Sequence, residues 1–405
     1  YIHLEIKSQE PNGLKGSPLC CSANGLDRYL LTEFSKQSIN KNFHRKEFST
    51  VREQIDNNLL PENCLQQCPL NQDDTIRTTI NNEYQQYIPF KEIVKNPILL
   101  RVNWKFGTTC NLACRMCDPS ISSHFNKVIQ SSKHLDTLNK TFRIVPKDNA
   151  VATSLEDLEK LKQILPNLEF LQVSGGEPFL SDDLEELLKT AISNKDNKHI
   201  SLEITTNGTK FIKEKLDIFC NFKKVQFIVS IDGTGDTYNY IRYPFKYNIL
   251  EKRLKYLATY IQKNQLQDKV SVVFVCMGML YNLFEYAKLE KLYYDIIIAN
   301  KIKHFNFTMD PNLTGFFKRN KHGKEEHYHV LNLKYAPTML IAEALDRYRD
   351  YKDRPWYNKL RYIYDNKQDT RYQRIIKEHT MILDEAYKQD YREHLHPSIV
   401  NFLNQ

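Results

Sequence analysis

Short apolar stretches alternate with amphipathic stretches through the middle of the chain. The spacing of apolar residues predicts helices over 182–193, 247–265 and 281–294, and the Ser-Leu-Glu-Asp segment at 154–157 is typical of a capping box that begins another helix. Six stretches between the helical patterns have the length and composition of buried strands: 99–104, 170–174, 200–205, 225–231, 270–277 and 302–309.

Strands that alternate with helices predict an α/β fold with a parallel sheet. Six strand–helix units are two fewer than a closed eight-fold barrel contains. We therefore expect an open, partial (β/α)6 TIM-like barrel over 99–310, with its chemistry in the loops that follow the strands.

The chain before this α/β domain has a different pattern. Residues 1–98 carry several cysteines and are expected to form a separate extension. Residues 1–6 alternate as a strand does, a Pro-Asn-Gly turn follows at 11–13, and 17–22 could return as the second strand of a hairpin. The stretches 28–60 and 73–87 are mostly helical in pattern.

The chain after the α/β domain, residues 311–405, lacks the strand–helix repeat. Residues 312–329 are polar and basic, which predicts an exposed loop, although their histidines and lysines could also contact an anionic substrate. Residues 336–405 are rich in tyrosine and helical in pattern. We expect these helices to cover the open side of the barrel and to line the substrate pocket.

Composition and charge exclude some classes of protein. No apolar run approaches the roughly 20 residues of a bilayer-spanning helix, which excludes an integral membrane protein, and the opening residues lack the apolar segment of a signal peptide. The net charge of +8 is modest for 405 residues, and acidic and basic residues are mixed. The balance weakly favours an anionic ligand and gives little support to nucleic acid as a partner.

Cysteine is more abundant than a chain of this length needs for stability. Seven of the nine cysteines lie within the first 117 residues. The odd total and the tight local spacings favour metal ligation in a reducing compartment over disulfides, so we expect a cytoplasmic protein. The sequence opens at Tyr1 without an initiator Met, and if the chain is trimmed there, a further ligand could precede Tyr1.

Three cysteines, Cys110, Cys114 and Cys117, follow the first predicted barrel strand within eight residues. Thiolates spaced this closely can converge on one soft metal centre. A zinc site would normally need a fourth ligand nearby, and this loop offers none. Three cysteines alone suit a cubane 4Fe–4S cluster with one iron open to a small ligand, while incidental or reactive thiols are the alternative.

The next predicted strands also end in distinctive motifs. Ser-Gly-Gly-Glu-Pro at 174–178 ends the second strand, Thr-Thr-Asn-Gly at 205–208 the third and Ser-Ile-Asp-Gly at 230–233 the fourth, and Arg242 follows twelve residues after Ser230. In this order, with the three-cysteine loop, these motifs resemble those of the radical S-adenosylmethionine (SAM) superfamily. The Gly-Gly-Glu segment looks like that superfamily's GGE motif.

The resemblance implies a reaction and a role for each motif. The three cysteines would ligate three irons of the cluster, and SAM would chelate the fourth iron through its amino and carboxylate groups. Reductive cleavage of SAM would then give methionine and a 5′-deoxyadenosyl radical that abstracts hydrogen from the substrate. In the peptide-modifying branch, a serine and an arginine at the positions of Ser230 and Arg242 bind the SAM carboxylate.

The same resemblance implies a set of SAM-contacting residues. Adjacent glycines let the backbone approach a ligand closely, and Met116 would either pack near the adenine or fill a gap in the core. The expected contacts with SAM come from Met116, Gly175, Gly176, Glu177, Thr206, Asn207, Ser230, Asp232 and Arg242. Read singly, the Thr-Thr-Asn-Gly segment could be a turn and Arg242 a solvated charge.

Four earlier cysteines, Cys20, Cys21, Cys64 and Cys68, form two pairs. With the preceding strand and turn they are similar to the twitch domain, a shorter relative of the SPASM domain, which implies an auxiliary iron–sulfur cluster. This extension usually follows the barrel but here precedes it, and Cys-x3-Cys stands where a tighter pair is expected. A tetrahedral zinc site and two pairs of free thiols stay open as alternatives.

The last two cysteines have weaker functional interpretations. Cys276 lies near the end of the fifth predicted strand, where a thiol could donate a hydrogen atom to a product radical, although such a residue is more often part of the core. Cys220 closes a predicted helix and is expected to be structural.

The leading hypothesis is a radical SAM enzyme that acts on a peptide or a small polar metabolite. An electron donor such as flavodoxin or ferredoxin would be its partner. The alternatives are a zinc-stabilised binding protein without catalysis and a radical SAM enzyme for a nucleotide or a sugar-like metabolite.

Overall fold

The computed structural model describes residues 4–6, 46, 49, 50, 53, 54, 57, 59, 100–142, 144–147, 152–304, 307–311, 316–319, 325–366 and 373–405. Its main sheet is wholly parallel, with strands in chain order from one edge to the other, and both β7 and β8 pair with β6. Within the described residues the sheet is open. Its strands are β1 (Leu4–Ile6), β2 (Arg101–Lys105), β3 (Phe170–Ser174), β4 (Ser201–Thr206), β5 (Lys224–Ser230), β6 (Val270–Met277), β7 (Lys303–His304) and β8 (Thr308–Asp310).

Each of the six predicted barrel strands is present, which confirms the open, partial barrel. The sixth is divided into β7 and β8. An additional strand, β1, pairs in parallel with β2, so Leu4–Ile6 belongs to the main sheet. The prediction that this stretch is the first strand of a separate hairpin missed this pairing, and the other half of that hairpin, 17–22, lies outside the described residues.

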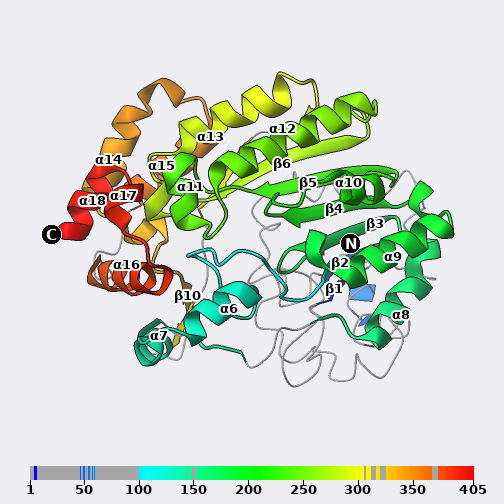
Figure 1. The fold of residues 1–405 in the computed structure, drawn as a ribbon, viewed down its shortest axis with the longest axis horizontal. Helices are drawn as coiled ribbons and strands as arrows, with labels where there is room; N and C mark the ends of the chain where they lie inside the picture. Colours follow the sequence, from blue (N-terminus) through cyan, green and yellow to red (C-terminus); the bar gives the residue numbers. More distant parts are fainter. Residues whose placement is uncertain are drawn as a thin grey trace.

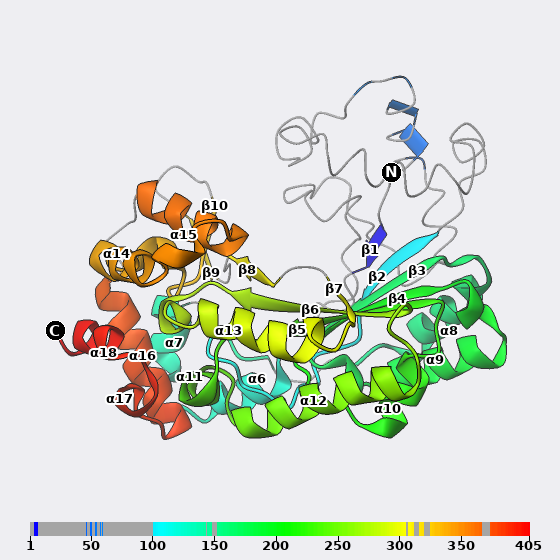
Figure 2. The ribbon, with the colours of Figure 1, turned by 90° about the horizontal axis from the view of Figure 1, so that it is seen from above.

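Helices lie along one face of the sheet (Figures 1 and 2). Serine caps define several of their N-termini: the Oγ atoms of Ser122, Ser154 and Ser181 accept hydrogen bonds from backbone N–H groups in the first turns of α6, α8 and α9. The helix expected over 281–294 begins only at Tyr286, after a 3-10 turn at Leu280–Asn282. The helices of this part are α6 (Ser123–Gln130), α7 (Leu135–Phe142), α8 (Leu155–Ile164), α9 (Asp182–Ser193), α10 (Lys213–Phe219), α11 (Gly235–Ile241), α12 (Tyr247–Lys263) and α13 (Tyr286–Tyr293).

The two faces of the sheet differ in character. On β2, Val102 and Trp104 are fully buried, whereas the alternate residues Asn103 and Lys105 are only partly buried. The same alternation runs through β3 and β4. A strand presents successive side chains to opposite faces, so one face forms the apolar core and the other carries the polar side chains of the barrel interior.

The C-terminal region is helical, as predicted. Figures 1 and 2 show α16, α17 and α18 together beyond one end of the sheet, beside α11, and contacts between α11 and α17 and between α6 and α16 support this placement. The helices are α14 (Thr338–Arg347), α15 (Pro355–Asp365), α16 (Gln373–Tyr387), α17 (Tyr391–His394) and α18 (Pro397–Asn404).

The exposed loop predicted over 312–329 is wrong for its described part. An antiparallel pair, β9 (Phe316–Arg319) and β10 (Glu325–Tyr328), occupies it. The prediction weighed the basic residues and overlooked that a hairpin places acidic positions opposite basic ones, as the register of Glu325 with Arg319 does here. His329, counted among the polar residues of that loop, is 1% exposed and lies in the core.

No helix in the described part of the chain combines the length and the apolar character that a membrane crossing requires.

Candidate functional site

The three-cysteine loop connects β2 to α6 and is held by hydrogen bonds near its middle and at its far end. Ala113 N donates to Tyr243 O at 2.7 Å, and Arg115 N donates to Ile241 O at 2.9 Å. The loop is therefore attached to the segment that follows α11. At its far end, Ser122 Oγ donates to Leu112 O at 2.6 Å and also caps α6. These bonds position the three cysteines rigidly at the end of β2.

The glycines of the GGE motif lie against the backbone that leads into this loop. A Cβ atom at Gly176 would lie 2.2 Å from Thr109 O, and one at Gly175 would lie 2.7 Å from Gly107 O. Gly175 also has a φ of +127°, which L side chains rarely adopt. Close packing between the ends of β2 and β3 therefore requires both glycines, and their predicted contact with SAM stays a prediction.

The carboxylate of Glu177 connects the ends of β3 and β4. It accepts hydrogen bonds from Thr206 Oγ1 at 2.7 Å, Asn207 N at 2.7 Å and Phe179 N at 3.1 Å. The residue is 1% exposed, and burial raises the pKa of its carboxyl group above the usual range. Glu177 thus fixes the Thr-Thr-Asn-Gly segment in place.

Asn207 connects that segment with the cysteine loop. Its Nδ2 lies 3.1 Å from Asn111 Oδ1 and 3.9 Å from Cys110 Sγ. Thr209 contributes a second connection, because Asn111 Nδ2 donates to its Oγ1 at 3.0 Å. The ends of β2, β3 and β4 therefore form one continuous hydrogen-bonded rim around Cys110.

An ion pair between Arg242 and Asp232 completes this rim. Arg242 Nε and Nη2 lie 2.7 and 2.5 Å from Asp232 Oδ2, and the other oxygen of Asp232 accepts from Met277 N at 2.7 Å. Both side chains are buried, and Arg242 also interacts with the thiol of Cys114. The structure thus brings Arg242 to the cysteine loop, and Asp232 holds its guanidinium there.

Two other residues predicted to contact SAM are less buried than Asp232 and Arg242. Ser230, the last residue of β5, is half-buried, and Met116 is partly buried and packs against the hydrophobic core. Their roles toward SAM stay predictions.

Burial and mutual repulsion hold the three thiols in their neutral form when no cation is present. Burial raises the pKa of Cys114 to about 12, and it raises the pKa values of Cys110 and Cys117 above the usual range as well. The cysteines reinforce this effect, because each negative charge disfavours the next. Three thiolates can coexist here only around positive charge, which fits an iron–sulfur cluster.

The described residues contain no group of three His, Cys, Asp or Glu side chains that could hold a single metal ion. A 4Fe–4S cluster presents a separate iron to each thiolate, so its ligands need not meet at one point. Cys20, Cys21, Cys64 and Cys68 lie outside the described residues.

Two buried tyrosine hydroxyls beside the loop have no hydrogen-bond partner, those of Tyr238 and Tyr387. Tyr238 is fully buried, and its electrostatic neighbours include Cys114. Tyr387 interacts with both Cys114 and Cys117. Buried donors are rarely left unpaired, so these hydroxyls also fit a site whose acceptor sulfurs arrive with the cluster.

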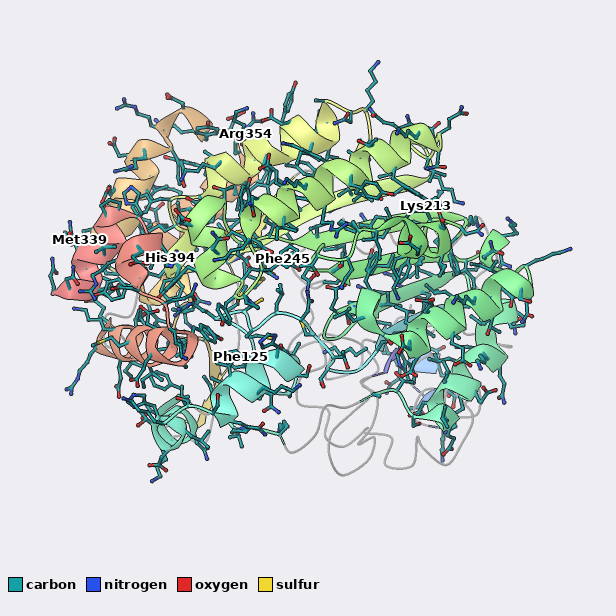
Figure 3. All side chains as sticks on the ribbon, viewed as in Figure 1. Phe125, Lys213, Phe245, Met339, Arg354 and His394 are labelled. Carbon is teal, nitrogen blue, oxygen red and sulfur yellow. The ribbon has the colours of Figure 1, made fainter. Side chains whose placement is uncertain are left out.

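Arg115, between the second and third cysteines, connects the loop to the C-terminal region. Its side chain is fully buried, forms an ion pair of 2.7 Å with Asp384 of α16 and donates to Gln389 Oε1 at 3.1 Å. Its guanidinium carbon lies 3.5 Å from the ring centroid of Tyr240, a cation–π contact. His394, labelled in Figure 3, stacks on the same Tyr240 ring with centroids 5.5 Å apart.

Sequence reasoning missed Arg115, Asp384 and Tyr387. A signal was present in Arg115, because an arginine between two metal ligands needs a partner if it is buried. That partner lies far along the chain, where an unaligned sequence offers no means to identify it.

Cys276 is fully buried below the rim. Its Sγ accepts from Asn282 Nδ2 at 3.3 Å and interacts with Asp232. Its predicted hydrogen-donor role stays a prediction. Cys220 is buried at the C-terminal cap of α10, which agrees with the structural role expected for it.

Comparison with known families identifies the central part of the chain. Residues 104–293 match the Radical SAM superfamily model, and this match supports an enzyme with SAM and a 4Fe–4S cluster as cofactors. The match runs from Trp104, within β2, to the end of α13 and so includes every motif of the rim.

The individual proteins that match are similar over only a part of their length or at low sequence identity. GTP 3′,8-cyclase from Aquifex aeolicus (strain VF5) is 31% identical over 109 residues, which is 26% of this chain and 27% of the relative. SuiB from Streptococcus suis bound to S-adenosylmethionine is 15% identical with a TM-score of 0.37, over 76% of this chain and 57% of SuiB. Histidine-tagged anSMEcpe with bound AdoMet is 18% identical with a TM-score of 0.40, over 65% of this chain and 60% of that protein. The chain thus spans about a quarter of the curated relative and less than two thirds of either structure.

Proposed function

We propose that this protein, whose residues 104–293 match the Radical SAM superfamily model, is an enzyme that cleaves SAM reductively and abstracts a hydrogen atom from a peptide or a small polar metabolite. The observation that carries the proposal is the rim itself. Three strand ends, one buried ion pair and the three-cysteine loop are connected by hydrogen bonds into a single site.

In this proposal Cys110, Cys114 and Cys117 each hold one iron of a 4Fe–4S cluster. The bound cluster supplies the electron that splits SAM into methionine and a 5′-deoxyadenosyl radical. Arg242 and Ser230 bind the SAM carboxylate. Arg242 is suited to this role because Asp232 already holds its guanidinium beside Cys114 and prevents it from moving out to solvent.

The remaining predicted residues position these groups. Glu177 holds Thr206 and Asn207, and Asn207 in turn lies against Cys110. The glycines at 175 and 176 let β3 approach the cysteine loop. Met116 packs near the adenine, and Cys276 donates a hydrogen atom to a product radical.

The finer parts of the proposal concern the flanking regions. A twitch-like extension over 1–98 would hold an auxiliary iron–sulfur cluster through Cys20, Cys21, Cys64 and Cys68, and 311–405 would cap the substrate. A cytoplasmic flavodoxin or ferredoxin would deliver the electron.

Peptide modification is the favoured substrate class because the Ser230-to-Arg242 arrangement resembles that of the peptide-modifying branch. A nucleotide substrate is the second candidate. It is supported by the local similarity to GTP 3′,8-cyclase, 31% over 109 residues. Binding of short peptides and of nucleoside triphosphates to the SAM-loaded protein would distinguish the two classes.

Anaerobic purification tests the proposal as a whole. We expect a brown protein that converts SAM to 5′-deoxyadenosine only when a reductant is present. Changing Cys110, Cys114 and Cys117 together to alanine should abolish that conversion, whereas Cys220→Ala, a buried cysteine away from the rim, should leave it intact. A colourless protein with stoichiometric zinc and no cleavage would refute the proposal in favour of the zinc-stabilised binding protein.

The auxiliary cluster has its own test. Changing Cys64 and Cys68 to alanine should remove about half of the iron and leave some SAM cleavage uncoupled from substrate. Full iron content in that variant would contradict the auxiliary assignment alone.

A further inference from the structure

Tyr387, in the last turn of α16, has a buried hydroxyl group without a hydrogen-bond partner. The residue is 3% exposed. Leaving a phenolic O–H unpaired in the protein interior is unfavourable, and buried tyrosines usually find an acceptor. An acceptor for this hydroxyl would have to be a group that binds beside it.

The ring of Tyr387 is fixed from two sides. It stacks on the ring of Tyr243 at a centroid distance of 5.0 Å and an interplanar angle of 10°. The guanidinium carbon of Arg115 lies 4.9 Å from its centroid. Arg115 is itself held by Asp384, one turn earlier on the same helix. The phenol therefore cannot turn to solvent without breaking these contacts.

Both residues that hold the ring belong to the cysteine loop or bind it. Arg115 lies between Cys114 and Cys117, and the backbone carbonyl of Tyr243 accepts the N–H of Ala113. The thiols of Cys114 and Cys117 are among the groups that act electrostatically on Tyr387. The unpaired hydroxyl thus lies near the thiols around which the proposed function places a cluster.

We infer that Tyr387 donates its phenolic O–H to a sulfur atom of the 4Fe–4S cluster held by Cys110, Cys114 and Cys117, so that α16 of the C-terminal region completes the cluster site. The inference rests on the proposed function. A hydrogen bond to a cluster sulfur stabilises the more negative, reduced state and raises the reduction potential. The C-terminal region would therefore adjust how readily the cluster accepts the electron that SAM cleavage needs.

The test is a reductive titration of the anaerobically reconstituted protein, followed by electron paramagnetic resonance. Tyr387→Phe should lower the midpoint potential by an amount equal to about a tenfold change in the reduction equilibrium, about 59 mV for one electron. Tyr391→Phe is the matched control, because it removes a hydroxyl of the same region that bonds to Asn404 instead. The midpoint potential of Tyr391→Phe should equal that of the unaltered protein.

A second variant has the opposite expected sign. Tyr387→3-fluorotyrosine keeps the ring and makes the hydroxyl a stronger donor, so the midpoint should rise. This variant also covers the case in which Tyr387→Phe does not fold.

The outcomes separate the two proposals. A reconstituted wild-type protein without a 4Fe–4S signal would refute the proposed function. A normal wild-type signal with midpoints that neither fall in Tyr387→Phe nor rise with 3-fluorotyrosine would overturn the role of Tyr387 and leave the proposed function standing.

Discussion

Replacing Glu177 tests how far the rim depends on a single buried carboxylate. Glu177→Ala leaves three donors without an acceptor: Thr206 Oγ1, Asn207 N and Phe179 N, which now lie 2.7, 2.7 and 3.1 Å from the carboxylate. Each unsatisfied buried donor costs about 1–3 kcal/mol, so the sum is about 3–9 kcal/mol. Water that enters the vacated space would bond to some of them. We expect a loss of about 3–5 kcal/mol in the free energy of unfolding.

Glu177→Gln separates shape from charge. Glutamine keeps the size of the side chain but has only one acceptor oxygen. With that oxygen in the place of Oε1, the bonds from Thr206 and Phe179 are retained, and the amide NH2 faces the N–H of Asn207. One donor is then unsatisfied, which predicts a loss of about 1–3 kcal/mol.

The pH dependence provides a second signature of Glu177. Burial raises the pKa of its carboxyl group above the value that the unfolded chain has, so the folded protein retains a proton that the unfolded chain has already released. The stability associated with this group is fully present below the unfolded pKa and is lost as pH rises through the folded pKa. Glu177→Gln has no titrating carboxyl group at this position. Its free energy of unfolding should therefore decline less than that of the unaltered protein as pH rises from the unfolded pKa of Glu177 to its folded pKa.

Urea unfolding of the metal-free protein at several pH values measures both effects. Glu156→Gln is the control, because the Glu156 side chain is 65% exposed and pairs with Lys160 at the surface. If Glu177→Gln unfolds at the same urea concentration as the unaltered protein and with the same pH dependence, the carboxylate does not hold the rim together.

Two further substitutions test other contacts of the rim. In Gly176→Ala the new Cβ would lie 2.2 Å from Thr109 O, so we expect loss of iron binding on anaerobic reconstitution. Gly235→Ala adds backbone strain, because the φ of Gly235 is +51°, but its Cβ meets no atom within 4 Å, so this control should lose some stability and still bind iron. Asp232→Ala leaves the buried guanidinium of Arg242 without its counter-ion and should cost about 3–5 kcal/mol in thermal or urea unfolding. Replacing both residues of that pair by apolar ones should restore much of this loss, and a double variant as unstable as the single one would contradict the explanation.

The strands and the rim motifs could be predicted from sequence because their signals are local. Short runs rich in apolar residues between helical patterns indicate strands, and the six predicted runs all became strands of the sheet. The three-cysteine loop and the Gly-Gly-Glu segment could be identified in the same way, since each chemical requirement falls within a few consecutive residues.

The features that were missed depend on residues far apart in the chain. The strand Leu4–Ile6 joins β2, about a hundred residues later, and its short alternating pattern contained no indication of that partner. The hydrogen bond between Arg115 and Gln389 spans 274 residues. Nothing in the composition of α16 distinguishes Asp384 and Tyr387 from ordinary helix residues, because their significance comes from the loop against which they pack.

The bond between Arg115 and Gln389 has a consequence for biosynthesis. The cysteine loop leaves the ribosome before the C-terminal residues that enclose it, which are translated up to 274 positions later. At about 5–20 residues per second, this interval lasts roughly 15–55 s. During that time the three thiols of the nascent chain are not yet covered by the C-terminal region. Cofactor insertion should therefore be most effective either while translation is still in progress or on a chain whose last helices can detach again.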